Sequence, residues 1–175
     1  WSKNKKHIHK LIRSSAIENF SPKEEPTIDP YFLGVLLGDG DLKNSLSITT
    51  MDKEIVEEIN KQCQRYKMTY RTEDSGKAKT YLLRCGRVGV NGGKLHNQLK
   101  DLGLRRKGAY EKSVPLRYKT GNLKTRLQVI AGLLDTDGSY TCGGYDFISA
   151  SKQLSEDLTF MCRSVGLAAY MSESI

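Results

Sequence analysis

Two stretches of the chain close on an aspartate followed by glycine, and together they supply two carboxylates that could act as a pair. Residues 32–40 lead into Asp39, and residues 130–138 lead into Asp137. Paired carboxylates offer the oxygen ligands that hard cations such as Mg²⁺ prefer, and a bound cation lowers the pKa of its water. Asp39 and Asp137 are therefore the first candidates for a metal site.

Both stretches are typical of apolar helices whose small residues share one face. Gly34 and Gly38 are four residues apart in the first, and Gly132 and Thr136 are four apart in the second. Small residues at this spacing let two helix backbones approach closely. We therefore expect a packed helix pair with both acids at the same end. The expected interface residues are Gly34, Gly38, Ala131 and Gly132.

The pattern of apolar residues predicts further elements around this pair. Asp29-Pro30 is typical of a helix start, with aspartate as the N-cap and proline at the first position. We expect a helix up to Asp39, a strand or short hairpin over 42–50, a helix over 52–66, strands over 67–73 and 77–87, and a helix over 92–102. A helix over 123–137, a hairpin over 139–149 turning at Gly143-Gly144, a helix over 152–165 and a strand from Leu167 follow.

Composition narrows the class of protein. With 28 Lys and Arg against 20 Asp and Glu in 175 residues, the net charge is +8, which favours nucleic acid as a partner before anionic membrane. The sequence has neither a membrane-spanning apolar run nor an apolar signal core, so we expect an intracellular protein (cytoplasm or nucleus) that is not secreted. The four cysteines and three histidines lack zinc-site spacing. The missing initiator methionine indicates a fragment, a processed product or part of a larger polypeptide.

Several motifs resemble the LAGLIDADG homing endonucleases, specifically the single-chain type with two motifs. Residues 130–138 read Ile-Ala-Gly-Leu-Leu-Asp-Thr-Asp-Gly, close to the signature of the family, and 32–40 is a more divergent copy. The intein-encoded members have blocks similar to 102–104 (Leu-Gly-Leu), 112–115 (Lys-Ser-Val-Pro), 118–121 (Tyr-Lys-Thr-Gly) and 163–167 (Arg-Ser-Val-Gly-Leu). The resemblance covers residues 30–172.

This resemblance implies an α+β fold in which an αββαββα half is repeated with pseudo-twofold symmetry. Two antiparallel sheets would form a saddle over duplex DNA around the central helix pair, and two-stranded ribbons fit the major groove. We expect a linker or peripheral segment over 1–29, a first half-domain over 30–122 and a truncated second half-domain over 123–175. The side chains expected at the DNA are Lys43, Ser45, Ser47, Lys67, Arg71, Lys77, Lys79, Arg84 and Arg87.

The resemblance also assigns roles to the acids and to one lysine. Asp39 and Asp137 become catalytic metal ligands, one for each DNA strand, with Mg²⁺ as the cofactor and Mn²⁺ able to substitute. Lys112, in the Lys-Ser-Val-Pro block, would polarise water or stabilise the reacting phosphate. Asp135 is expected to be structural, and Asp41 is a candidate for tuning the metal site. The basic residue that matches Lys112 in the second half would lie beyond the end of this sequence.

The implied function is cleavage of double-stranded DNA at a long specific target by a monomer linked to, or excised from, a protein-splicing domain. Two alternatives stay open. A protein of this fold could bind nucleic acid without cutting it, as group I intron maturases and related regulators do. The chain could also be an inactive, truncated endonuclease insert. Retention of Asp39 and Asp137 argues against the binding-only alternative, whereas the shortened second half keeps the inactive insert open.

Overall fold

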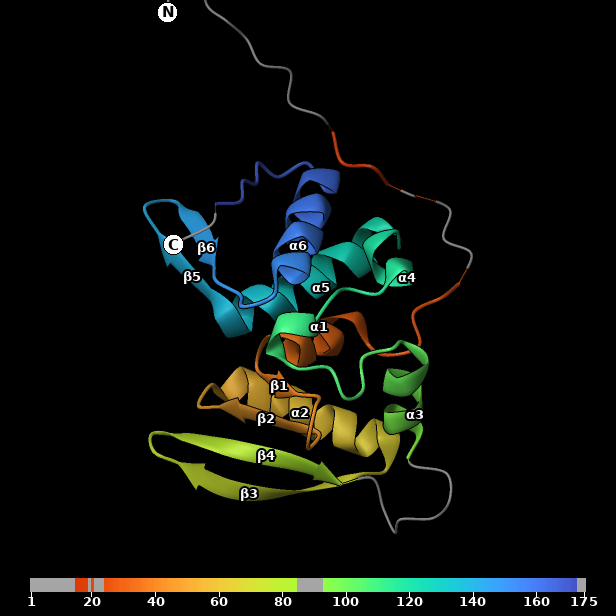
Figure 1. Ribbon diagram of the computed structural model, residues 1–175, viewed down its shortest axis with the longest axis vertical. Helices are drawn as coiled ribbons and strands as arrows, with labels where there is room; N and C mark the ends of the chain where they lie inside the picture. Colours follow the sequence, from red (N-terminus) through yellow and green to blue (C-terminus); the bar gives the residue numbers. More distant parts are fainter. Residues whose placement is uncertain (1–14, 19, 21–23, 85–92, 173–175) are drawn as a thin grey trace, which may run out of the picture.

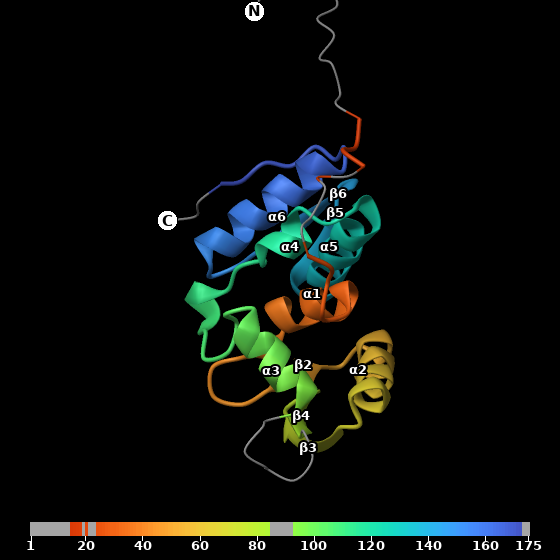
Figure 2. The same cartoon turned by 90° about the vertical axis from the view of Figure 1, so that its right-hand side faces the viewer.

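The computed structural model describes residues 15–18, 20, 24–84 and 93–172. Figures 1 and 2 show its helices and two sheets. The first elements are α1 (Pro30–Gly38), β1 (Gly40–Asp41), β2 (Ser47–Thr50), α2 (Lys53–Tyr66), β3 (Thr69–Ser75), β4 (Ala78–Arg84) and α3 (Lys94–Asp101). They are followed by η1 (Ala109–Glu111), α4 (Leu116–Lys119), α5 (Leu123–Asp137), β5 (Gly138–Thr141), β6 (Gly144–Phe147) and α6 (Lys152–Ser164). No helix in the described ranges is long and apolar enough to cross a membrane.

Helices α1 and α5 lie side by side at the centre of the molecule, between the four-stranded sheet and the β5–β6 hairpin (Figure 1). The start of α1 follows from the sequence: the Asp29 carboxylate accepts hydrogen bonds from N–H groups of the first turn, and Pro30 occupies the first position. At the start of α5, the Asn122 side chain accepts a hydrogen bond from the Thr125 N–H group at 2.8 Å. The predicted start of α1 and both predicted ends of α5 are confirmed.

The backbones of α1 and α5 touch because glycine faces glycine. A Cβ added to Gly34 would lie 2.5 Å from the Val129 carbonyl oxygen and 2.9 Å from the Cα of Gly132. A Cβ added to Gly132 would lie 2.2 Å from the Tyr31 carbonyl oxygen. Side chains cannot be accommodated at such distances, so the separation of the helices depends on these glycines. Ala131, beside this contact, is half-buried and lines a cavity together with Tyr31.

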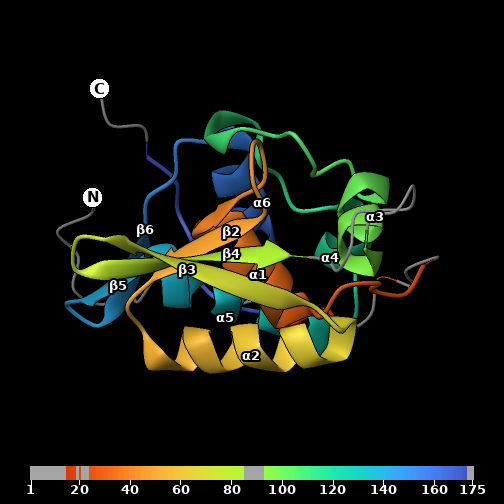
Figure 3. The ribbon, with the colours of Figure 1, turned by 90° about the horizontal axis from the view of Figure 1, so that it is seen from below.

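Both sheets are antiparallel, and the order of elements early in the chain recurs later. The first sheet has the strand order β1-β2-β4-β3, and the second consists of β5 and β6. Helix α2 runs beside the first sheet (Figure 3). The series α1-β1-β2-α2 is matched by α5-β5-β6-α6. The α+β class with antiparallel sheets is confirmed, whereas the complete αββαββα repeat, its pseudo-twofold symmetry and the half-domain boundaries stay predictions.

The stretch predicted as a strand or short hairpin over 42–50 is a hairpin. Strands β1 and β2 pair antiparallel, with residues 42–46 between them. The Asp41 carboxylate shapes this connection by accepting hydrogen bonds from the N–H groups of Lys43, Asn44 and Ser45 at 2.8, 3.2 and 3.2 Å. Residues 43–45 therefore bond to the Asp41 side chain instead of to a neighbouring strand, although their alternating pattern predicts a strand.

Two strand predictions are wrong at particular residues. The strand predicted from Lys67 begins at Thr69, because Lys67 takes a left-handed conformation (φ 53°) as the C-cap of α2. The Met68 N–H group then bonds to the Cys63 carbonyl oxygen. The strand predicted from Leu167 does not form up to residue 172. Strand β3 is held in place by β4, whereas no strand of the described chain pairs with the segment after Leu167.

The turn between β5 and β6 comes one residue earlier than predicted. It lies at Cys142-Gly143, with φ angles of 49° and 84°, and Thr141 pairs with Gly144 across it. A two-residue hairpin turn with two positive φ angles matches the twist of antiparallel strands. The short elements η1 and α4 were not predicted, because neither is long enough to show a periodic pattern.

Residues that precede α1 pack into the core. Ile28 is buried, and its N–H and carbonyl groups both bond to the hydroxyl group of Tyr118, at 2.8 and 3.0 Å. The fully buried guanidinium of Arg126, from α5, donates to the carbonyl oxygens of Ile17 and Glu18. It also donates to the carbonyl and hydroxyl oxygens of Ser164 in α6. Part of the segment predicted as a linker is therefore tied to α5 and α6.

We expect Gly132→Ala to destabilise the fold, because the new methyl group would lie 2.2 Å from the Tyr31 carbonyl oxygen. Overpacking costs about 1–3 kcal/mol, and a rigid backbone neighbour favours the upper end. Gly108→Ala is the matched control, since the nearest atom to its new Cβ would be a side-chain oxygen at 3.5 Å. The free energy of unfolding from urea titration measures the difference. Equal losses in the two variants would contradict the importance of the helix contact.

Candidate active site

The ends of α1 and α5 bring Asp39 and Asp137 together. Asp39 is the C-cap of α1, and Asp137 is the last residue of α5. Gly38, directly before Asp39, lies against the end of α5 without room for a side chain: an added Cβ would be 1.9 Å from Thr136 Oγ1 and 3.3 Å from Asp137 Oδ2. The two carboxylates therefore share one end of the helix pair.

Both carboxyl groups are held where ionisation is disfavoured. Burial, and after it the charge of Asp137, raises the pKa of Asp39 to about 6, although the charge of Lys112 acts in the opposite direction. Asp137 is exposed, unlike the half-buried Asp39, but the partial desolvation of its carboxyl group still raises its pKa, again against the effect of Lys112. Two carboxylates that repel each other in a partly desolvated site are stabilised by a cation placed between them.

Lys112 lies beside both acids. Its side chain is only 8 % exposed, and its Nζ donates a hydrogen bond to the carbonyl oxygen of Gly38 at 2.7 Å. Burial lowers the pKa of Lys112, and the charges of Asp137 and Asp39 act in the opposite direction. The bond to Gly38 fixes the ammonium group at the end of α1 and leaves its other N–H groups for further partners.

Two residues that the sequence analysis missed hold Lys112 in place. The Ser151 hydroxyl group donates to the Lys112 carbonyl oxygen at 2.6 Å and accepts from the Leu154 N–H group as the N-cap of α6. The buried Asp157 carboxylate accepts from the Val114 N–H group at 2.8 Å. A serine directly before an amphipathic helix is a readable N-cap signal, but its second bond joins residues far apart in the sequence.

Asp41 and Asp135 have other partners. Partial burial acts to raise the pKa of Asp41, but hydrogen bonds from three backbone N–H groups and the Ser45 hydroxyl outweigh it, and the pKa lies below its usual value. The exposed Asp135 carboxylate accepts a hydrogen bond from the Tyr31 hydroxyl at 2.8 Å, which links α5 to α1. Asp41 thus shapes a turn, and Asp135 joins the helix pair.

The donor set suits a hard divalent cation. The described residues contain no cluster of three or more His, Cys, Asp or Glu, so a cation here would rely on Asp39 and Asp137. Mg²⁺ is commonly bound by one or two carboxylates and completes its octahedron with water and substrate phosphate oxygens. An open pair of carboxylates therefore fits Mg²⁺ or Mn²⁺ acting on a phosphate substrate better than a closed structural site.

One face of the first sheet presents arginine to solvent. Directly paired residues share a face, and the pairings Arg71–Leu82 and Thr69–Arg84 put both exposed arginines on the same side. We call this side the outer face; by register it comprises Asp41, Ser47, Thr49, Thr69, Arg71, Glu73, Ser75, Ala78, Thr80, Leu82 and Arg84. Arg71 also forms an ion pair with Glu73 at 2.5 Å, and Thr49 and Thr80 share a hydrogen bond at 2.8 Å.

Lys79 lies on the opposite side of the sheet from Arg71 and Arg84. It is directly paired with Thr50, and the buried Tyr81 two residues further on is paired with Ile48. The alternation of side chains along the strand therefore separates Lys79 from the two arginines with which the sequence analysis grouped it.

The other predicted DNA contacts fall into three groups. Ser47 pairs with Leu82 and so lies on the outer face, but it is only 6 % exposed and shares a hydrogen bond with the half-buried Ser45 at 3.0 Å, so it is less accessible than the sequence analysis expected. Three lysines are exposed at the ends of elements: Lys43 after β1, Lys67 after α2 and Lys77 in the β3–β4 turn. Arg87 lies outside the described residues.

The β5–β6 hairpin differs chemically from the first sheet. Residues 138–151 contain neither lysine nor arginine. The rings of Tyr140 and Tyr145 lie against each other, tilted by 56° with their centroids 5.0 Å apart, and the two residues are 65 % and 63 % exposed. The Asp146 carboxylate accepts a hydrogen bond from Thr141 at 2.8 Å. Sequence reasoning missed this contrast, although the run without basic residues is visible in the sequence.

Comparison with known proteins gives one curated relative. No family model matches the chain. The replicative DNA helicase DnaB of Mycobacterium intracellulare is 29 % identical over 159 residues, which make up 90 % of this chain and 22 % of the helicase. The chain thus spans about a fifth of the length of the curated relative that it matches.

Solved structures of the homing endonuclease I-DmoI share the architecture. Mesophilic variants of I-DmoI match with a TM-score of 0.55 and 14 % identity, covering 79 % of this chain and 76 % of theirs. I-DmoI in complex with DNA and Mn matches with a TM-score of 0.54 and 15 % identity, covering 79 % and 77 %. The chain adopts the I-DmoI fold. Fold alone does not fix chemistry, so a function shared with I-DmoI has to be argued from the site.

We expect Asp39→Asn to stabilise the metal-free chain at neutral pH. Folding raises the pKa of Asp39 from 3.8 to about 6, so the folded state binds this proton more tightly, and the ionised group lowers stability at pH 7.5. After allowance for solvent screening, the gain should be about 1–2 kcal/mol. It should shrink as the pH falls through 6 towards 4, where both states become protonated. Urea titrations in EDTA at pH 7.5 and at pH 4 measure the gain in stability. A gain independent of pH would contradict the raised pKa of Asp39.

Proposed function

We propose that the chain is a site-specific DNA endonuclease domain that hydrolyses phosphodiester bonds with a divalent metal held by Asp39 and Asp137. One observation carries this proposal: two carboxyl groups with raised pKa values meet at the ends of α1 and α5, beside the buried ammonium group of Lys112. Clusters of perturbed groups of this kind are typical of catalytic centres. The I-DmoI fold supports the choice of substrate, since I-DmoI has been crystallised with DNA and Mn.

In the proposed mechanism the metal activates water, while Asp39, Asp137 and Lys112 hold the metal and stabilise the reacting phosphate. A bound Mg²⁺ or Mn²⁺ would lower the pKa of water and stabilise charge on the attacking and leaving oxygens. Asp39 and Asp137 supply carboxylate oxygens from two different helices, so each half of the fold contributes one ligand. Lys112, anchored on the Gly38 carbonyl oxygen, would donate a hydrogen bond to a phosphate oxygen or a water molecule and offset the charge that builds on the reacting phosphate.

Double-stranded DNA is the proposed partner, and the outer face of the first sheet is its proposed contact surface. Arg71 and Arg84 are exposed on this face, which also carries the hydroxyl side chains of Thr49, Thr69 and Thr80. Arginine and hydroxyl groups hydrogen-bond both to phosphates and to base edges in the major groove. The β5–β6 hairpin would contact DNA through the Tyr140 and Tyr145 rings and hydroxyl groups instead of cations. We therefore propose an asymmetric target, bound more strongly by salt-dependent contacts on the side of the first sheet.

The match to part of a helicase sequence supports the interpretation that this chain is an element inserted into a longer protein. The match covers 22 % of a replicative DNA helicase, which is what a self-contained segment within a longer precursor would give. The Lys-Ser-Val-Pro block that begins at Lys112 resembles the intein-encoded type. We propose that the chain is an intein-type endonuclease that acts as a monomer inside the cell and is joined to a protein-splicing domain.

The catalytic proposal is tested by strand-resolved cleavage. The chain is incubated with randomised duplex libraries and Mg²⁺, and cut ends on each strand are sequenced for the unaltered chain, Asp39→Asn and Asp137→Asn. Each substitution should reduce cutting of one strand by roughly 100-fold or more while leaving DNA binding in place. Asp135→Asn is the matched control, since its carboxylate bonds to Tyr31 and should not affect cutting to that extent.

Other outcomes of this experiment support different functions. Tight binding by the unaltered chain without cutting, even with Mn²⁺, would support the binding-only alternative. Absence of both binding and cutting would support an inactive insert. Loss of activity in Asp135→Asn equal to that in Asp137→Asn would contradict the assignment of metal ligands.

The contact surface is tested by the salt dependence of DNA affinity. If Arg71 and Arg84 contact phosphates, Arg71→Ala and Arg84→Ala should each reduce the slope of log affinity against log salt by about one. Lys124→Ala removes the same charge at the start of α5, away from the outer face, and should leave the slope unchanged. Fluorescence anisotropy between about 50 and 200 mM salt measures the slopes. Equal slopes for all three variants would rule out the outer face as the main contact.

A further inference from the structure

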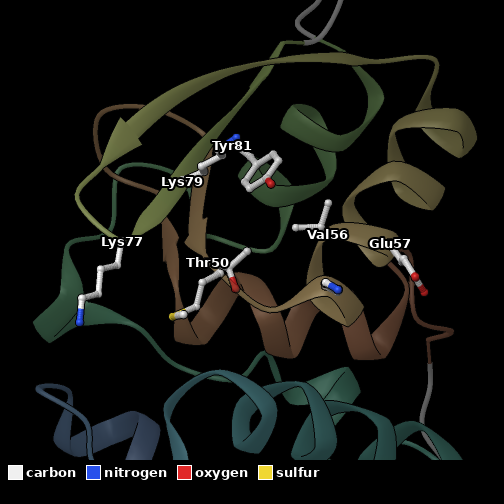
Figure 4. Close-up of a pocket in the computed structure, with 8 residues that line it drawn as sticks. Thr50, Val56, Glu57, Lys77, Lys79 and Tyr81 are labelled. Carbon is white, nitrogen blue, oxygen red and sulfur yellow. The ribbon is translucent and has the colours of Figure 1, made fainter.

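A cavity of about 460 Å³ lies between strand β4 and the start of helix α2, on the side of the sheet opposite the outer face (Figure 4). We call it the lysine pocket, because Lys53, Lys77 and Lys79 all line it. Its only acidic lining residue among those described is Glu57, which points away from β4 in Figure 4. The excess of positive charge favours an anionic occupant.

The wall of the pocket contains the hydroxyl group of a largely buried tyrosine. Tyr81 is only 8 % exposed and lines the cavity from β4, facing Val56 of α2 (Figure 4). Among the described residues its hydroxyl has no hydrogen-bond partner, and it is not one of the fully enclosed polar atoms, so an occupant of the cavity can accept from it. The buried Thr50 also lines the cavity; its Oγ1 accepts from the Asp52 N–H group at 3.1 Å and keeps its own hydrogen available.

The first turn of α2 adds a third kind of donor. Asp52 occupies the N-cap position, but its carboxylate forms no capping hydrogen bond to the helix. The N–H groups at the start of this 14-residue helix therefore lack the side-chain acceptor that they usually have, and the helix dipole favours negative charge there. Lys53, the first residue of α2, belongs to the lining of the pocket.

The pocket lies at the end of the sheet where the proposed catalytic acids are. Gly40, directly after Asp39, pairs with Ile48, and Thr50 follows two residues later on the same strand. Asp52 is near enough for its charge to contribute to the raised pKa of Asp39. An anion in the lysine pocket would therefore lie close to the centre of a duplex placed over the two acids.

We propose that the lysine pocket is a phosphate-binding site. The assignment of this phosphate to the DNA backbone near the centre of the target rests on the proposed function. The pocket combines hydroxyl, ammonium and backbone N–H donors from β2, β4 and α2, and such a mixed set of donors suits the several oxygens of a tetrahedral phosphate. Lys79, on the inner side of the sheet, thereby gains a role that contact with the outer face would not give it.

The pocket itself is tested without DNA. Inorganic phosphate is titrated into the ¹⁵N-labelled chain, and amide shifts are followed at residues 53–55 and at Tyr81. Saturable shifts should appear in the unaltered chain and weaken about 10-fold in affinity in Tyr81→Phe and Lys79→Met, in line with loss of one charge-assisted hydrogen bond. Tyr110→Phe, at an exposed tyrosine, and Lys124→Met, at the start of α5, are matched controls that should bind phosphate normally. Circular dichroism checks that every variant is folded.

The source of the phosphate is tested by methylphosphonate interference. Single neutral phosphates are placed along a bound duplex, and the position that weakens binding of the unaltered chain is compared in Tyr81→Phe and Lys79→Met. One central position should lose its effect in these two variants and keep it in the two controls. Such a position assigns the pocket to the DNA backbone.

Phosphate shifts without such a position would assign the pocket to a free phosphate and overturn the DNA assignment. If amide shifts and a matching methylphosphonate position are both absent, the phosphate site is overturned. If the chain binds no DNA, the proposed function fails, but the phosphate titration still decides the pocket.

Discussion

The close contact of the α1 and α5 backbones is the constraint on which the rest of the structure depends. Gly34 and Gly132 let the helices meet, and Gly38 keeps the same separation beside Thr136 at their ends. The positions of the Asp39 and Asp137 carboxylates are therefore set by where the ends of α1 and α5 lie. A change of one methyl group at the crossing point would move two acids that are one to two turns away, because a helix transmits such a shift as a rigid rod.

The site at the helix ends is electrostatically unfavourable in the absence of a cation. Desolvation raises the pKa of both acids, the charge of Asp137 adds to the effect at Asp39, and the compensating charge comes from a lysine whose own pKa is lowered by burial. Groups under this kind of strain persist only where the surrounding structure holds them. Here the support comes from Ser151 and Asp157, which bond to the backbone around Lys112 from a different helix.

Local signals predicted much of this arrangement, whereas long-range pairing decided the rest. Asp29-Pro30 predicted the start of α1, and the spacing of glycines indicated a helix pair. Both signals depend only on residues that are close together in the sequence. Alternation along β4 already separates Lys79 from Arg84, but the placing of Arg71 on the same face as Arg84 depends on the register between β3 and β4. The missing strand after Leu167 depends on a partner, and the support that Ser151 gives to Lys112 joins segments that the sequence separates by 39 residues. These three pairings do not follow from a local pattern.

The buried guanidinium of Arg126 has a consequence for the limits of the folded unit. Its described acceptors are neutral oxygens, and two of them, the carbonyls of Ile17 and Glu18, belong to the segment before the first motif. A chain cut immediately before Pro30 would keep both motif helices but leave a buried cation short of acceptors, which costs more than the loss of an exposed contact. The smallest independently stable unit therefore extends at least to Ile17 and crosses the boundary that the motifs alone would draw. Tension on the leading segment would likewise be transmitted directly to α5, the helix that ends at Asp137.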